Sequence, residues 1–176
     1  AMNESNSRVI HTYPDPVLRG VAEPVTDIDD ETQALIDCMA ETMYAAPGIG
    51  LAANQVGELK RVVVYDLTSR EKGPDLQVLI NPEIVLAEGG TTYEESCLSV
   101  VDYAAEVARS AKVKVRGVDR DGRPVDVEAD GLLAICLQHE IDHLNGVLYI
   151  DHISNLKRAL YKKRLKKLMK KDAFSE

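Results

Sequence analysis

Residues 130–146 read DGLLAICLQHEIDHLNG, and this stretch predicts a buried helix. Asp130 has a side chain suited to cap the start of a helix, and Asn145-Gly146 is a typical helix stop. Residues 132–137 are all apolar, so no side of the first turns is suited to contact with water. The helix is therefore expected to lie at the centre of the fold, covered by other elements.

The same helix carries His139, Glu140 and His143 in the spacing HExxH. Residues four apart lie on the same side of a helix, so the two imidazoles can bind one cation. Glu140 can then reach a water molecule on that cation. A solvated surface cluster is the alternative, but burial of unpaired His and Glu side chains would be costly. The motif predicts a metal-dependent hydrolase with Glu140 as the general acid/base.

A metal site of this kind needs a further protein ligand. Two familiar protease patterns do not supply it, because no Glu lies within residues 141–175 and the third His of HExxHxxGxxH falls on Tyr149. His152 comes three residues too late for that pattern. A thiolate suits zinc or ferrous iron. The residues alone leave three candidates: Cys38, Cys97 and Cys136. For Cys38 and Cys136, burial in the core is the ordinary interpretation.

The remaining segments predict an α+β fold. A first helix is expected from Asp30 to about Ala46, with Asp29 or Asp30 as its cap. Residues 48–55 read as a glycine-containing loop. Four segments rich in Val and Ile read as strands: 61–67, 77–87, 112–119 and 124–129. A helix, successive strands and then further helices are typical of the α+β class.

The 176 residues suit a single domain over residues 1–176. No apolar run of about eighteen residues occurs, so no membrane span is expected. Residues 1–8 lack the apolar stretch of a signal peptide. Three cysteines are too few and odd in number for a disulfide framework, which favours a reducing compartment. These features predict a cytoplasmic protein.

The charge of the chain is unevenly distributed. Its net charge is −8, yet residues 154–171, which read as a third helix capped by Ser154, hold nine Lys and Arg and no acidic residue. The rest of the chain has 12 basic and 29 acidic residues. Such a C-terminal basic helix is suited to an anionic partner, although a solvated face is the ordinary interpretation. Leu156 and Leu160 lie nearly opposite the apolar stripe of this helix, which contains Tyr161, Leu165, Leu168 and Met169.

Three sequence blocks resemble those of the peptide deformylase family. Residues 48–55 read GIGLAANQ, residues 95–99 read ESCLS and residues 138–143 read QHEIDH. The blocks occur in the order and spacing typical of the family, and the similarity extends from about Tyr13 to Leu168. Three blocks in order are far more specific than HExxH alone.

The resemblance implies a hydrolase that removes the formyl group from the N-terminal formylmethionine of new polypeptides and releases formate. It implies antiparallel β-sheets packed around a central HExxH helix. It selects Cys97 as the third ligand beside His139 and His143. The implied native metal is Fe2+, with Zn2+, Ni2+ or Co2+ in purified protein.

The resemblance also implies roles around the metal. Glu140 is the implied catalytic residue, and the side chain of Gln55 and the backbone N–H of Leu98 are the implied donors to the developing oxyanion. Glu95 is expected to contact Arg109 beside the site. The substrate pocket is expected to be lined by Ile49, Gly50, Glu95, Leu132, Ile135 and Cys136. The implied partners are N-formylmethionyl peptides and, through the basic helix, the ribosome, and the implied state is a monomer that does not bind membranes.

Three positions depart from the family pattern. Ser96 replaces the usual Gly, so the loop is strained if that position needs a positive φ. Val101 replaces the usual Pro, and Ala104 stands where many members have an Arg that holds the peptide. These changes keep two alternatives open: a hydrolase of another N-acyl amine, and a metal-binding protein with little catalysis.

Overall fold

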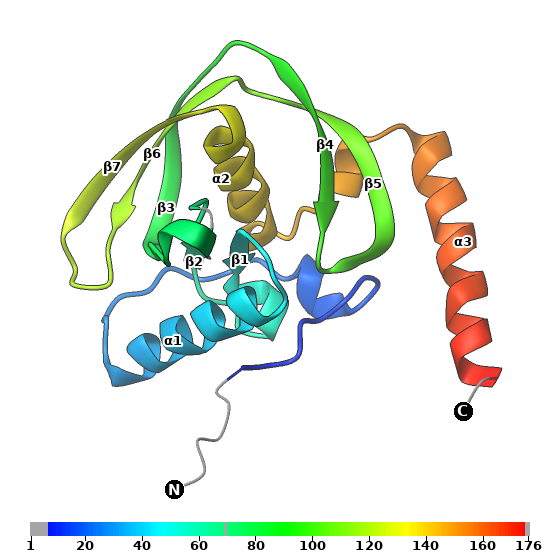
Figure 1. The fold of residues 1–176 in the computed structure, drawn as a ribbon, viewed down its shortest axis with the longest axis horizontal. Coiled ribbons are helices and arrows are strands. Elements are labelled where there is room, and N and C mark those ends of the chain that lie inside the picture. Colours follow the sequence, from blue (N-terminus) through cyan, green and yellow to red (C-terminus); the bar gives the residue numbers. More distant parts are fainter. Residues whose placement is uncertain (1–6, 69, 175–176) are drawn as a thin grey trace, which may run out of the picture.

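The computed structural model describes residues 7–68 and 70–174, and its fold is α+β (Figure 1), which confirms the predicted class. The α-helices in these ranges are α1 (Asp30–Ala45), α2 (Gly131–Leu144) and α3 (Asn155–Phe174). The strands are β1 (Gly50–Ala52), β2 (Val62–Tyr65), β3 (Gln77–Glu88), β4 (Thr91–Cys97), β5 (Val100–Arg109), β6 (Lys112–Val118) and β7 (Pro124–Asp130). The 3-10 helices are η1 (Pro16–Arg19), η2 (Ala53–Val56), η3 (Arg70–Lys72) and η4 (Tyr149–His152).

Five strands form an antiparallel sheet in the order β1-β2-β3-β6-β7. The strands β2, β3, β6 and β7 begin and end within two residues of the segments predicted from their Val and Ile content. These side chains are largely buried in β2, where all four residues are covered. The strand propensity of this part of the chain was therefore a reliable guide to its structure.

Two features of the sheet structure were not predicted. The interpretation of residues 48–55 as a loop is wrong for β1, which pairs with β2 through Leu51 and Val64. The segments β4 and β5 form a separate antiparallel hairpin that sequence analysis missed. One side of this hairpin consists of small and polar exposed residues, such as Thr92, Ser96 and Ala104, so it lacks the continuous Val and Ile content of the other strands.

Helix α2 lies between the five-stranded sheet and the β4–β5 hairpin (Figure 1). Its sheet side (Ala134, Leu137, Ile141 and Leu144) belongs to an apolar cluster with residues of β2, β3 and β6, including Val63, Leu79 and Val115. Its hairpin side (Gln138, His139 and Asp142) carries polar groups. The arrangement confirms antiparallel sheets packed around the HExxH helix.

The predicted helix ends differ in how they are capped. Asp29 accepts a hydrogen bond from the Thr32 N–H at 2.9 Å, as expected for a cap of α1. Asp130 occupies the cap position of α2, but its side chain makes no capping bond. Gly146 has a φ of +75°, and a Cβ there would lie 2.6 Å from the Arg19 carbonyl oxygen. A glycine is therefore required where α2 stops.

Helix α3 lies beside the hairpin and away from the five-stranded sheet (Figure 1). Tyr161 and Leu165 are buried in a cluster with Val100 and Tyr149. Leu156, Leu160 and Met169 are exposed. Of the stripe predicted for this helix, Tyr161 and Leu165 are therefore buried, Leu168 is half-buried and Met169 is exposed. Among the described residues, no helix is long and apolar enough to cross a membrane.

Candidate metal centre

Three side chains from two distant parts of the chain meet beside α2. The Nε2 atoms of His139 and His143 are 3.2 Å apart, and Cys97 Sγ lies 3.4 Å from His143 Nε2. The ligand atoms of the three residues all lie within 4.8 Å of one another. A thiolate and two imidazoles converging in this way fit a divalent transition metal. Of the three cysteines left open by the residues alone, Cys97 is the one in this cluster.

Local structure explains how these side chains come together. His139 and His143 are one turn apart on α2, as the spacing predicted. Cys97 is the last residue of β4, and the pairing between β4 and β5 shifts register between Ser96 and Cys97. The shift ends regular pairing, so Cys97 pairs with Val100 across a tight turn. The hairpin thereby delivers the sulfur atom to the histidines.

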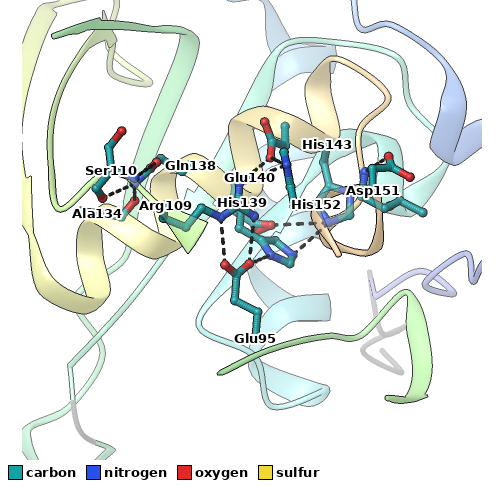
Figure 2. A network of polar contacts seen from close by, with 12 residues as sticks. Glu95, Arg109, Ser110, Ala134, Gln138, His139, Glu140, His143, Asp151 and His152 are labelled. Carbon is teal, nitrogen blue, oxygen red and sulfur yellow. Dashed lines mark hydrogen bonds and ion pairs between the residues drawn. The ribbon is translucent and has the colours of Figure 1, made fainter. Parts of the chain in front are cut away.

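Glu95 holds the ring of His139 from the hairpin side. Its Oε1 lies 2.8 Å from His139 Nδ1, which leaves Nε2 free to bind a cation. Arg109 donates to both oxygens of Glu95, at 2.8 and 2.9 Å, so the expected contact between them is present. Burial would raise the pKa of Glu95, but the hydrogen bonds from Arg109 and His139 lower it. Glu95 is thus held as a carboxylate (Figure 2).

Further polar residues extend the hydrogen-bonded group of Glu95, Arg109 and His139. Sequence analysis gave these further residues no role. Arg109 Nη1 donates to Asp142 Oδ2 at 2.6 Å, and His152 Nε2 lies 2.9 Å from the same oxygen. Gln138 Nε2 donates to the Ser110 carbonyl at 2.9 Å, and its Oε1 accepts the Ser110 N–H at 3.0 Å. Gln138 and Asp142 belong to the QHEIDH block, so their place on the helix of His139 was the available signal.

The ring of Tyr149 stacks on His139, with centroids 5.9 Å apart and an interplanar angle of 25°. Tyr149 stands at the position that a third histidine ligand would occupy in one protease pattern. Here it is buried, and its hydroxyl donates to the Tyr103 carbonyl at 2.9 Å. An aromatic face therefore restrains His139 on a second side.

Gln55 points into the protein and does not face solvent. Its Nε2 donates to Ser99 Oγ at 3.0 Å and lies 3.7 Å from Cys97 Sγ, while its Oε1 accepts the Ala52 N–H at 3.0 Å. The amide is therefore oriented with its donor group toward Cys97 Sγ. Leu98, whose N–H was the other expected oxyanion donor, lines the adjacent cavity.

Glu140 lies on the other side of the two histidines, against β1. Its Oε2 would be 2.8 Å from a Cβ built on Gly50, so a glycine there leaves room for the carboxylate. Its Oε1 is 3.9 Å from His143 Nε2. Burial raises the pKa of Glu140 to about 7. A carboxyl group with such a pKa can both accept and donate a proton near neutral pH.

A cavity of about 510 Å³ opens beside this carboxylate and the cysteine. All six residues predicted to bind substrate line it: Ile49, Gly50, Glu95, Leu132, Ile135 and Cys136. Ile49 and Leu132 are 44% and 40% exposed, which places them at its mouth. Burial raises the pKa of the Cys136 thiol well above its usual value, so Cys136 is a neutral wall of the cavity.

Among the positions that depart from the family pattern, Ser96 causes no backbone strain. The non-glycine residues with positive φ in the described ranges are Asn81 and Asp102, so Ser96 does not need that conformation. Ser96 pairs with Ala104 across the hairpin, and both are exposed. The carbonyl of Val101 accepts a hydrogen bond from the Tyr161 hydroxyl at 3.0 Å. The conditional expectation of a strained ligand loop is therefore not met.

Comparisons with known proteins agree on one family. The model of the polypeptide deformylase family matches residues 7–159. A peptide deformylase of Mesorhizobium japonicum is 56% identical over 161 residues, which cover 91% of this chain and 92% of that protein. The crystal structure of a peptide deformylase from Legionella pneumophila is 44% identical with a TM-score of 0.88, covering 95% of this chain and 98% of that one. The structure of the Ehrlichia chaffeensis enzyme in complex with actinonin is 37% identical with a TM-score of 0.86, covering 92% and 96%.

Proposed function

Because the chain belongs to the polypeptide deformylase family, it removes the formyl group from the N-terminus of new polypeptides, and we propose that Cys97, His139 and His143 hold the required metal. The support for this ligand set is the convergence of their ligand atoms within 4.8 Å. A divalent cation there supplies a Lewis acid for the formyl carbonyl and for water. Fe2+ is the proposed native ion, and Zn2+, Ni2+ or Co2+ suit the same donors.

Glu140 is the proposed general acid/base. Its carboxylate accepts a proton from the attacking water and later gives that proton to the departing amine, while formate leaves. The observation that carries this assignment is the position of Glu140 at the cavity wall together with its pKa of about 7. Gly50 supports the assignment because its missing side chain leaves space for the carboxylate.

Gln55 and the N–H of Leu98 are the proposed donors to the oxyanion. The Gln55 amide is fixed by Ala52 and Ser99, so its Nε2 is already oriented toward the site. Donors fixed before the reaction need no reorganisation when negative charge develops on the carbonyl oxygen. Leu98 follows the cysteine ligand directly and lines the same cavity.

The proposed substrates are N-formylmethionyl peptides bound in an extended conformation. Ile49, Leu132, Ile135 and Cys136 give the cavity an apolar wall suited to the methionine side chain. The cavity lies between β1, an edge of the five-stranded sheet, and β4, whose strand partner is β5. An extended peptide can add as a strand to such edges.

The first experiment measures formate release from a formyl-Met peptide, with protein purified without oxygen and loaded with ferrous iron. Rapid release that stops with a chelator is the expected result. A panel of other N-acyl peptides then tests whether Ser96 and Ala104 have changed the acyl group that is accepted. No release from the formyl peptide by protein with bound iron would contradict the proposal.

We further propose that residues 1–176 act as one cytoplasmic catalytic domain, as a monomer. Sedimentation of the purified protein tests the monomer.

The basic helix α3 is the proposed ribosome contact, because exposed lysines such as Lys162, Lys163 and Lys166 can pair with RNA phosphates. Cosedimentation with ribosomes should weaken when these three lysines are replaced by Glu, and unchanged cosedimentation would contradict this contact.

A further inference from the structure

The short helix η4 contacts the charged groups behind the metal site. His152, its last residue, lies with Nε2 2.9 Å from Asp142 Oδ2 and 3.4 Å from Arg109 Nη1. Figure 2 shows His152 among these side chains. Its side chain is 37% exposed, so it forms the solvent end of this group. The mechanism proposed above gives His152 no role.

A continuous series of short contacts joins His152 to the proposed metal ligand His139. Asp142 Oδ2 accepts a hydrogen bond from Arg109 Nη1 at 2.6 Å. The Nε and Nη2 atoms of Arg109 donate to the two carboxylate oxygens of Glu95. Glu95 Oε1 lies 2.8 Å from Nδ1 of His139. The path therefore runs His152, Asp142, Arg109, Glu95 and His139, from solvent to a proposed ligand.

Asp142 is less buried than Arg109 and Glu95, so its orientation depends more on its hydrogen bonds. Arg109 and Glu95 have side chains that are 4% and 3% exposed, whereas the Asp142 side chain is 26% exposed. One oxygen of Asp142 receives both bonds, so removing His152 leaves a partly exposed carboxylate held by one partner.

A free carboxylate at this point affects Arg109 directly. The guanidinium group of Arg109 forms ion pairs with both Glu95 and Asp142. Rotation of Asp142 therefore removes one of the two ion pairs that fix Arg109. Glu95 then loses part of its own restraint, and Glu95 sets the ring of His139. Partners behind metal ligands commonly control how tightly a metal is held.

We propose that His152 is a positioning residue, which holds His139 in its ligand orientation by donating from Nε2 to Asp142. This inference rests on the proposed metal ligand set. It predicts that His152 slows metal release, and that an Nε2–H donor is the property required. The aromatic shape of its ring alone does not suffice.

The test compares His152→Phe with His152→Gln in cobalt-loaded protein. Phe keeps a planar ring without a donor, whereas the Gln side chain ends in an Nε2 donor. Cobalt release to excess chelator, followed by the visible absorption of the thiolate-bound ion, should be about three- to tenfold faster for His152→Phe. His152→Gln should stay within about twofold of the original protein.

His11 offers a matched control. It makes a similar contact with Asp15, at 2.7 Å, and its side chain is 36% exposed, yet that pair is not joined to the path behind the metal. His11→Phe should therefore release cobalt at the original rate. Thermal unfolding of every variant separates a local effect from loss of the fold.

Three outcomes would overturn the inference: an unchanged rate in folded His152→Phe, equal acceleration in His152→Gln, or equal acceleration in His11→Phe. The assay needs no substrate. Faster cobalt loss from His152→Phe would therefore stand even if the original protein released no formate. Failure to bind cobalt at all would instead overturn the proposed ligand set.

Discussion

The two sides of α2 place buried glutamates in opposite environments. On the sheet side, Glu140 lies against Gly50 and Cys136, and burial raises its pKa to about 7. On the hairpin side, burial would likewise raise the pKa of Glu95, but Arg109 and His139 lower it. Both carboxyl groups are almost inaccessible to solvent, so burial alone does not distinguish them.

The difference between the two carboxyl groups comes from their partners. A group whose pKa lies near neutrality can exchange a proton during each turnover. A group held as a carboxylate can instead act as a constant negative charge behind a metal ligand. Two glutamates with pKa values moved apart in this way can perform different tasks in one site.

The largest expected effect follows removal of the proton carrier. Glu140→Ala should lower the rate of formate release by roughly 10²–10⁴-fold, because the general acid/base is lost. The metal content should remain unchanged, since Glu140 is not in the proposed ligand set. Formate assays and metal analysis on the same preparation check both statements. Full activity in this variant would remove the distinction between the two glutamates.

The next largest effect is expected on the hairpin side. Arg109→Met should destabilise the protein by about 3–5 kcal/mol, because it leaves the buried charge of Glu95 and the charge of Asp142 without their common partner. Urea unfolding measures the change. If the loss is below about 1 kcal/mol, Arg109 contributes no more than a surface ion pair.

A core substitution on the sheet side should separate stability from metal binding. Leu137→Ala should cost about 2–5 kcal/mol, since Leu137 is fully buried in the apolar cluster. Cobalt release from the remaining folded protein should keep its original rate, because no hydrogen bond to a ligand is removed. Faster release would mean that apolar packing also sets the orientation of the ligands.

A smaller effect is expected when the charge of Glu95 is removed and its shape is kept. Glu95→Gln should weaken metal affinity by about 10–100-fold, because His139 loses its charged acceptor. A competition titration with a chelator gives the affinity. Unchanged affinity would show that the hydrogen bond to His139 is sufficient and that the negative charge of Glu95 is not required.

The sequence predicted the sheet side of α2 better than the hairpin side. Strands β2, β3, β6 and β7 are rich in branched apolar residues, and the apolar run 132–137 marked the helix they cover. Strand β1 is only three residues long and begins with Gly50, so no periodicity identifies it. The hairpin has an exposed outer side, and its inner side contains Glu95 and Arg109, which read as surface residues in a sequence.

The candidate site was predictable in part for the same reason. His139, Glu140 and His143 are close in sequence, so helix geometry alone brought the two imidazoles together. Cys97 is 46 positions from His143, and its approach depends on the register shift at the end of β4. His152 lies three positions too late for the protease pattern, and its contact with Asp142 depends on how η4 packs against β4 and β5.

The two strand edges beside the cavity also bear on self-association. Unpaired edges are templates on which other chains aggregate. Here β1 is three residues long, and β4 carries the charged Glu94 and a register shift near its end. Short length, charge and irregular pairing each discourage a second copy from extending the sheet. The same edges can therefore stay open to the single peptide strand proposed as substrate without favouring pairing between copies of the chain.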